Sequence, residues 1–243
     1  MKVNILQHIR MMITCLMFIQ MPILIAGNNA VPATTLISHI NHSLYPTNSF
    51  SDLYECMELE EKGLSKDAFE KAIEGYQELL NSQTLKRIDI ITIADFSKPS
   101  NEERLFVIDL KNNKILHKTL VAHGKNSGLL YARDFSNKPE TNKSSLGFYL
   151  TLNSYSGEHG FSLRLKGLEK NINDKAFERA IVMHGAPYVS QKNVQQNGFI
   201  GRSLGCPAIP MANAGPIIQS IKNGTLLFIY HPSKQYINQS AII

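Results

Sequence analysis

The sequence contains no tryptophan and only 3 cysteines among its 243 residues. So few cysteines exclude a scaffold stapled by disulfides. Charge is also scarce, since charged side chains make up 19% of the chain and the formal net charge is +5. This small, scattered positive excess does not indicate a nucleic-acid partner. With 43% hydrophobic residues and no repeats, the composition excludes disorder, collagen and coiled coil, and the length fits one domain with a small appendage.

The N-terminus has the pattern of a secretory signal peptide. Lys2 and Arg10 precede an apolar stretch over residues 11–26, and small residues follow at 27–30. A glutamine and a proline interrupt this stretch, which is shorter than the ~20 apolar residues of a membrane span. We therefore expect residues 1–26 to be removed by cleavage after residue 26 or 30, leaving a mature chain without a stable membrane span. An uncleaved anchor is the alternative.

The mature chain divides into segments of different pattern. Residues 31–50 are polar and show no period, as in a linker. Residues 51–84 have apolar side chains every three or four positions, which predicts a small helical lead of two helices, the second capped by Ser65. A β-rich domain is expected over 85–231, followed by a C-terminal tail over 232–243.

Runs rich in β-branched residues predict that this domain is mainly β, with short helices. The asparagine pair at 112–113 suits the positive φ of a tight hairpin turn. The long polar stretch 123–146 is typical of a functional loop. Helical patterns occur at 173–180 and 210–221. The expected strands lie at 88–94, 105–110, 115–122, 147–152, 161–165, 180–183 and 225–230.

His184 and Cys206 are the leading candidates for chemistry. His184 ends a predicted buried strand, a rigid position for a general base, and a nucleophilic cysteine needs such an imidazole. Gly205 permits backbone conformations closed to other residues, and its N–H can approach a substrate oxygen. Pro207 favours an extended backbone at Cys206, which keeps the thiol out of a helix interior. From the spacing alone, a structural thiol, a metal ligand and a disulfide remain open interpretations.

The other cysteines and histidines have simpler interpretations. Cys56 falls on the first lead helix and is interpreted as a buried structural thiol, although it could pair with Cys206 in an oxidising compartment. His123, His159 and His184 each precede a glycine, and three histidines could form a zinc set. They lack the spacing of a known zinc motif, so no metal or other cofactor is expected.

Several segments resemble the L,D-transpeptidase (YkuD-type) catalytic domain. Ile181–Gly185 followed by Ser203–Cys206 is similar to the family signature H-G…S-x-G-C, and Ser144–Thr151 is similar to its T-P-x-G strand. Segments resembling the murein branch of this family lie at 95–97, 121–128, 135–137, 201–208 and 227–230. The resemblance spans about residues 85–230. It implies a β-sandwich-like domain and cysteine acyl transfer on peptidoglycan stem peptides.

The resemblance also implies a role for each motif residue. Cys206 would be the nucleophile and His184 the general base, with Ser203 or the Gly185 carbonyl orienting the imidazole. The N–H groups of residues 204–206 would form the oxyanion hole. The thiolate would attack the carbonyl between diaminopimelate and the terminal D-alanine of a tetrapeptide stem. An amine of a second stem would then complete a 3→3 cross-link.

The sequence departs from the broad family pattern S-H-G-C-[IVL]-R. Leu204 replaces the histidine, and Pro207-Ala208 replaces the last two residues, so the arginine is missing. Arg202 either supplies a bidentate partner for the stem carboxylate or is an ordinary solvated side chain.

Three further residues are candidates for the substrate cleft. His123 and His159 either line it or are ordinary loop histidines. Tyr188, close to the end of the His184 strand, either walls the site or packs in the fold. The signal peptide and the substrate class predict a periplasmic or cell-envelope location. An L,D-carboxypeptidase or other cysteine amidohydrolase, and a non-catalytic wall-binding protein, stay open as alternatives.

Overall fold

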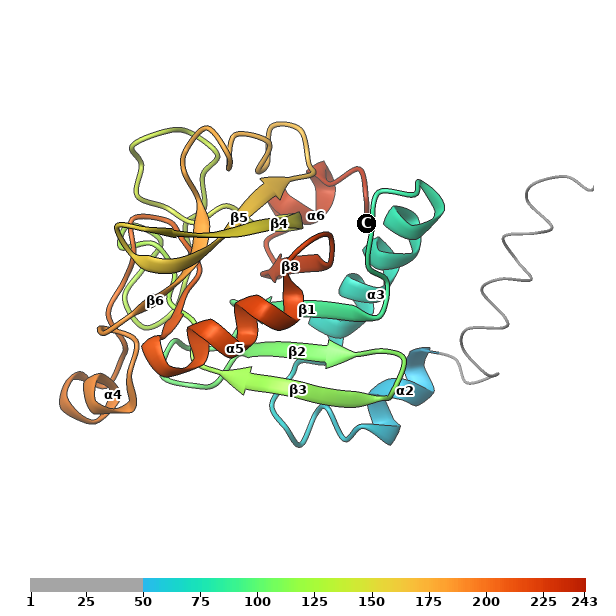
Figure 1. Cartoon of the computed structure of the whole chain (residues 1–243), viewed down its shortest axis with the longest axis horizontal. Coiled ribbons are helices and arrows are strands. Elements are labelled where there is room, and N and C mark those ends of the chain that lie inside the picture. The colour runs from blue at the N-terminus through green and yellow to red at the C-terminus, as the bar shows by residue number, and fades with distance from the viewer. Residues whose placement is uncertain (1–49) are drawn as a thin grey trace, which may run out of the picture.

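The computed structural model describes residues 50–243 of the chain. The predicted signal peptide and nearly all of the expected linker lie outside the described residues. An eight-stranded sheet forms the centre of the fold, with short helices around it (Figure 1), which confirms the predicted strand-rich class. In this described part, no helix is long and apolar enough to cross a membrane.

Two helices precede the first strand, as expected for the helical lead. The helices are α2 (Phe50–Cys56), α3 (Lys66–Asn81), α4 (Gln191–Asn197), α5 (Met211–Ile221) and α6 (Lys234–Gln239). The strands are β1 (Ile90–Asp95), β2 (Leu105–Asp109), β3 (Lys114–Thr119), β4 (Gly147–Gly157), β5 (Gly160–Gly167), β6 (Val182–Ala186), β7 (Ala208–Pro210) and β8 (Leu226–Tyr230).

The strands form one sheet in the order β3-β2-β1-β8-β4-β5-β6-β7. β1 and β8 are parallel, as are β6 and β7, and the other neighbours are antiparallel. α5 contacts β1, β4, β5, β6 and β7. The helix has 11 residues and is about 16 Å long, whereas the flat distance from β1 to β7 would be ~24 Å. The sheet therefore curves around α5, and Figure 1 shows β4 and β5 on one side of this helix and β2 and β3 on the other.

The centre of the sheet is covered on both faces. Every residue of β1 and β8 is buried, and α3 and α5 both contact β1. Gly75 lets α3 approach closely, because a Cβ at this position would lie 2.1 Å from Cζ of Phe148 on β4. Phe148 stacks on Phe228 of β8 with ring centroids 4.1 Å apart. The helical lead thus packs into the same hydrophobic core as the sheet.

Ser65 immediately precedes α3, as predicted, but its hydroxyl does not cap the helix. The Oγ donates instead to the Asp95 carboxylate at 2.6 Å, and the Ser65 N–H donates to the same oxygen at 3.1 Å. Asp95 ends β1, so this contact fastens the helical lead to the sheet. The predicted hairpin turn is also present, with Asn113 at a φ of 51° between β2 and β3.

The interpretation of Cys56 as a buried thiol is wrong. The apolar stripe of this segment consists of Leu53, Tyr54 and Met57, all buried, and Cys56 falls on the opposite, exposed face. Cys56 and Cys206 are both free thiols in the structure.

The predicted helix over 173–180 is also wrong, because this segment is a series of turns. The Asn173 side chain donates to the carbonyls of Leu146 and Phe148 at 2.9 and 3.0 Å and accepts from the Glu169 N–H at 2.9 Å. These long-range bonds compete with helix formation, and Ala180 closes the segment with a φ of 54°.

Two helices were not predicted at all. α4 follows β6, and α6 lies within the residues expected as a C-terminal tail. Tyr236 of α6 is 4% exposed and belongs to the main core, so the end of the chain takes part in packing.

Candidate active site

His184 and Cys206 reach one pocket from neighbouring elements. His184 lies in the middle of β6, and Cys206 lies in the loop that enters β7, the parallel neighbour of β6. The pocket has a volume of about 480 Å³. It is lined by Glu158, His159, Gly160, His184, Gly185, Ala186, Pro187, Tyr188, Arg202, Ser203, Leu204, Cys206 and Met211.

The His184 ring is oriented by the backbone of the next residue. Its Nδ1 lies 3.0 Å from the Gly185 carbonyl oxygen. A carbonyl can only accept, so Nδ1 carries the proton and Nε2 remains free to act as a base. Burial lowers the pKa of His184, the Gly185 bond raises it and the neighbouring His159 lowers it further. The imidazole is therefore biased toward the neutral form that a general base requires.

The Cys206 thiol is biased toward its neutral form as well. Burial raises its pKa, while the N–H of Val182 and the charge of Arg179 act in the opposite direction. The Sγ contacts the Ala180 carbonyl at 3.8 Å, and the structure as described has no hydrogen bond between Sγ and the His184 ring. The opposite pKa shifts of the two groups disfavour a permanent thiolate–imidazolium pair.

Ser203 holds the loop that carries the cysteine. Its Oγ accepts from the Gly205 N–H at 3.0 Å and donates to the Cys206 carbonyl at 2.6 Å. The hydroxyl is thus engaged within the loop and makes no bond to His184, whose orientation comes from Gly185.

Gly205 is required by the loop conformation. It has a φ of 128°, and a Cβ at this position would lie 3.0 Å from the Lys143 carbonyl oxygen. Its N–H is bonded to Ser203, whereas the N–H groups of Leu204 and Cys206 have no acceptor among the described residues. The free donors of this loop are therefore those of residues 204 and 206, two of the three expected in an oxyanion hole.

Three of the four predicted substrate contacts line the pocket. The exposed His159 ring, from the β4–β5 turn, stacks on His184 with centroids 4.6 Å apart. Tyr188 forms part of the wall, and burial raises its pKa to about 12. Arg202 is exposed and donates to the carbonyls of Lys125 and Gly128 at 3.2 and 3.3 Å.

His123 does not line the pocket. It is 0% exposed, its Nδ1 lies 2.9 Å from Arg104 Nη2, and its Nε2 lies 3.2 Å from the Gly128 carbonyl. Burial is the main cause that lowers the His123 pKa to about 4, so the ring is neutral. The His123 carbonyl accepts from the Ser203 N–H at 3.0 Å, so this residue supports the cysteine loop from behind.

Arg104 is a structural residue that the sequence analysis did not identify. It is fully buried, donates to the carbonyls of Val121 and Lys98 at 2.9 and 2.7 Å, and lies over the Phe96 ring at 4.5 Å from its centroid. Burial lowers its pKa to about 9. Its partners are the backbone carbonyls of residues 6 and 17 positions away in the sequence, a pairing that no local pattern predicts. Arg104 holds the ring of His123 and thereby the segment whose carbonyl accepts from the Ser203 N–H.

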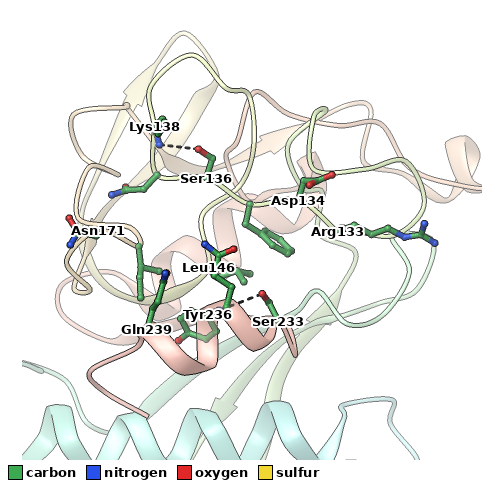
Figure 2. Close-up of a pocket in the computed structure, with 13 residues that line it drawn as sticks. Arg133, Asp134, Ser136, Lys138, Leu146, Asn171, Ser233, Tyr236 and Gln239 are labelled. Carbon is green, nitrogen blue, oxygen red and sulfur yellow. Dashed lines mark hydrogen bonds between the residues drawn. The ribbon is translucent and has the colours of Figure 1, made fainter.

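A second pocket, shown in Figure 2, has a volume of about 360 Å³ and lies between the 133–138 loop and α6. Amides, hydroxyls and both signs of charge surround an apolar floor that includes Leu146 and Tyr236. No cysteine or histidine lines it, so this pocket offers neither a thiol nor an imidazole. Among the described residues there is also no cluster of three or more side chains that could hold a metal ion.

A model of the L,D-transpeptidase catalytic domain matches residues 60–230, which is more than half of the chain. The chain belongs to this family. The L,D-transpeptidase match begins within the helical lead, so α3 is part of the family domain rather than a separate appendage. No curated protein has a matching sequence.

Solved structures with an L,D-transpeptidase-like fold include three instructive examples. The L,D-transpeptidase from Mycobacterium smegmatis is 13% identical, with a TM-score of 0.37 over 59% of this chain and 59% of that chain. L,D-transpeptidase 3 from Mycobacterium tuberculosis is 10% identical, with a TM-score of 0.37 over 59% and 61%. The helical cell shape determining protein Pgp2 from Campylobacter jejuni is 16% identical, with a TM-score of 0.38 over 66% and 57%. The chain covers less than two thirds of the length of these proteins.

Proposed function

We propose that the protein is a peptidoglycan L,D-transpeptidase in which Cys206 attacks the carbonyl between diaminopimelate and the terminal D-alanine of a tetrapeptide stem. One pocket supports this proposal, because it contains the Cys206 thiol, the His184 imidazole with Nε2 free, and a loop with two unengaged N–H donors. Membership of the L,D-transpeptidase family supports the class of reaction.

In the acylation half-reaction, Nε2 of His184 takes the thiol proton as Sγ attacks the carbonyl. The neutral pair becomes an imidazolium and a tetrahedral oxyanion, to which the N–H groups of Leu204 and Cys206 donate. The Gly185 carbonyl keeps the second ring proton on Nδ1. The imidazolium then protonates the D-alanine nitrogen, the C–N bond breaks and a thioester remains on Cys206.

In the second half-reaction, an amine of another stem attacks the thioester carbonyl. His184 accepts a proton from this amine, the new amide forms and the sulfur leaves as a thiolate that His184 reprotonates. The product is a 3→3 cross-link between stems, with no cofactor. Water in place of the amine would give a trimmed tripeptide.

The proposed substrate requires an exported protein. A cleaved signal over residues 1–26 and a periplasmic or cell-envelope location fit the basic start and apolar stretch of the N-terminus. Fractionation of cells that express the full chain, with N-terminal sequencing of the product, tests this part. A product in the envelope fraction that starts after residue 26 or 30 supports it, and an intact N-terminus in the cytoplasm contradicts it.

The reaction is tested by incubating the purified protein with disaccharide-tetrapeptide and analysing the products by mass spectrometry. A 3→3 dimer with release of D-alanine is the expected result. Tripeptide without dimer would indicate a carboxypeptidase, and unchanged substrate would indicate a binding protein.

Two cysteine variants provide matched controls. Cys206→Ala should abolish both the products and the mass adduct formed by a carbapenem, which acylates such a thiol. Cys56→Ser changes an exposed thiol outside the pocket and should leave both intact. Full turnover by Cys206→Ala would exclude the mechanism.

A further inference from the structure

Arg179 carries a positive charge that has no carboxylate partner. Its Nη1 donates to the Ser136 carbonyl at 2.8 Å and to Ser145 Oγ at 2.5 Å, and its Nη2 donates to the Lys143 carbonyl at 2.8 Å. All three acceptors are neutral, and none of the ion pairs among the described residues includes this side chain. A half-buried positive charge without a counter-ion is available to stabilise an anion that forms nearby.

The guanidinium lies directly behind the cysteine loop. Its Nη2 would be 3.4 Å from a Cβ placed on Gly205, so only the glycine backbone separates it from the loop interior. The next residue, Ala180, contacts the Cys206 Sγ through its carbonyl at 3.8 Å. Ala180 has a φ of 54°, a left-handed conformation that is unfavourable for a residue with a Cβ. The strained turn therefore places the Ala180 carbonyl against the Cys206 sulfur and the Arg179 guanidinium against the backbone of Gly205.

We propose that Arg179 is a positioning residue of the active site, which stabilises the Cys206 thiolate and the developing oxyanion through the Gly205–Cys206 loop. This proposal rests on the assignment of Cys206 as the reacting thiol. Arg179 neither accepts nor donates a proton in the reaction, and the thiol proton still goes to His184. The guanidinium lowers the free energy of the anion that this transfer produces.

The electrostatic coupling acts in both directions. Burial is the main cause for both groups and raises the pKa of Cys206 and lowers the pKa of Arg179. In opposition, the charge of Arg179 lowers the pKa of Cys206, and the thiolate raises the pKa of Arg179. The family pattern S-H-G-C-[IVL]-R places an arginine two residues after the cysteine, and Arg179 does not occupy that position. That position is Ala208 here, 0% exposed within β7, so its side chain points into the core.

Other charged or titratable groups face Cys206 from the pocket side. Lys143 also lies near the loop, but its Nζ is 3.7 Å from the Asp134 carboxylate, so its charge already has a partner. The pocket-side groups are Glu158, His159, His184, Tyr188 and Arg202. Arg202 lies on the pocket side and is exposed to solvent. Arg179 is therefore the cation that lies behind the loop without a carboxylate partner.

The test measures the pH dependence of Cys206 alkylation by iodoacetamide, with site-resolved mass spectrometry of the intact chain. Arg179→Gln removes the charge, Arg179→Lys keeps it, and Arg87→Gln is the matched control. Arg87 also donates to backbone carbonyls, those of Ser220 and Lys222 at 2.8 and 3.1 Å, but it does not line the pocket. Arg87 also pairs with the Asp89 carboxylate at 3.2 Å, so Arg87→Gln reports the effect of losing structural hydrogen bonds and an ion pair outside the pocket.

We expect Arg179→Gln to raise the alkylation midpoint by about one pH unit and to slow alkylation below that midpoint roughly tenfold. Arg179→Lys should return the midpoint toward the original value, and Arg87→Gln should leave it unchanged. An unchanged midpoint in a folded Arg179→Gln protein would overturn the proposal, as would a Lys variant that behaves like the Gln variant. Alkylation needs no peptidoglycan, so a failure to form cross-links would refute the proposed function without affecting this result.

Discussion

The rings of His159 and His184 are stacked, with centroids 4.6 Å apart and planes inclined by 25°. His159 is exposed on the β4–β5 turn, whereas His184 is 4% exposed on β6. A second positive charge on such closely spaced rings is unfavourable, so His159 helps to keep His184 neutral and able to accept a proton. The stack thus couples a surface residue to the proposed general base.

Replacing His159 with phenylalanine should move the acidic limb of the activity profile to higher pH. Phenylalanine keeps the stacking and the cover over His184 but removes the neighbouring imidazole that lowers its pKa, so the pKa of His184 should rise. Since only neutral His184 can accept the thiol proton, carbapenem acylation of Cys206 should then require a higher pH. Acylation rates measured between pH 4 and 8 test this, with His231→Phe as the control because His231 packs against Phe135 outside the pocket. An unshifted limb would mean that the stack has no electrostatic role.

The loop glycine provides a second prediction. Gly205→Ala should lower acylation of Cys206 by about two orders of magnitude, because the displaced loop would no longer present its N–H donors. The strained φ should also cost roughly 1–3 kcal/mol of stability. Gly63→Ala is the control, since Gly63 has a φ of 92° with nothing within 4 Å of a Cβ. The Gly63→Ala variant should lose stability but keep its acylation rate. An equal loss of acylation in both variants would contradict a specific role for the Gly205 loop.

The hydroxyl of Ser203 should matter through the loop rather than through His184. Ser203→Ala removes the acceptor of the Gly205 N–H and the donor to the Cys206 carbonyl. We expect a loss of roughly 1–2 kcal/mol of stability and about tenfold slower acylation, because the sulfur is no longer held in place. The acidic limb of the activity profile, which depends on the pKa of His184, should stay fixed. A shift of that limb would show that Ser203 orients the imidazole. Ser233→Ala removes the hydroxyl that accepts from the Tyr236 N–H at the start of α6, and it should affect thermal stability only.

Seven of the eight strands were predicted from local patterns, the exception being β7, whereas the pairing of His184 with Cys206 rested on the family resemblance. β-branched runs favour extended structure, and the His–Gly and Gly–Cys steps each place a reactive side chain beside a flexible backbone. Their juxtaposition across β6 and β7 then agrees with the structure.

The supporting residues could not be predicted in this way. Arg179 falls in a segment with helical spacing, but the Asn173 side chain bonds to the carbonyls of Leu146 and Phe148 and the segment forms the strained loop behind Cys206 instead. Similarly, a His–Gly step in a polar loop suggests a cleft residue, whereas His123 is buried against an arginine far from it in sequence. Such roles depend on tertiary partners that no local pattern specifies.

Glu169 provides a prediction for stability because it is a buried acid that anchors the C-terminal helix. Its carboxylate is 3% exposed and accepts from the Phe148 N–H at 2.7 Å, Ser240 Oγ at 2.5 Å and Tyr236 OH at 3.3 Å. Burial raises its pKa above the usual 4.5, although these three bonds lower it.

The folded protein therefore binds this proton more tightly than the unfolded chain does, so the stabilisation is full below about pH 4.5 and is lost as the pH rises through the folded pKa. Glu169→Gln keeps an acceptor for the Phe148 N–H but cannot ionise, so it should lack this loss. The difference in melting temperature between Glu169→Gln and the unchanged protein should grow in favour of the variant from pH 4 to pH 7. The exposed Glu61→Gln should show no such trend. A difference independent of pH would mean that the carboxyl group ionises equally easily in the folded and unfolded chains.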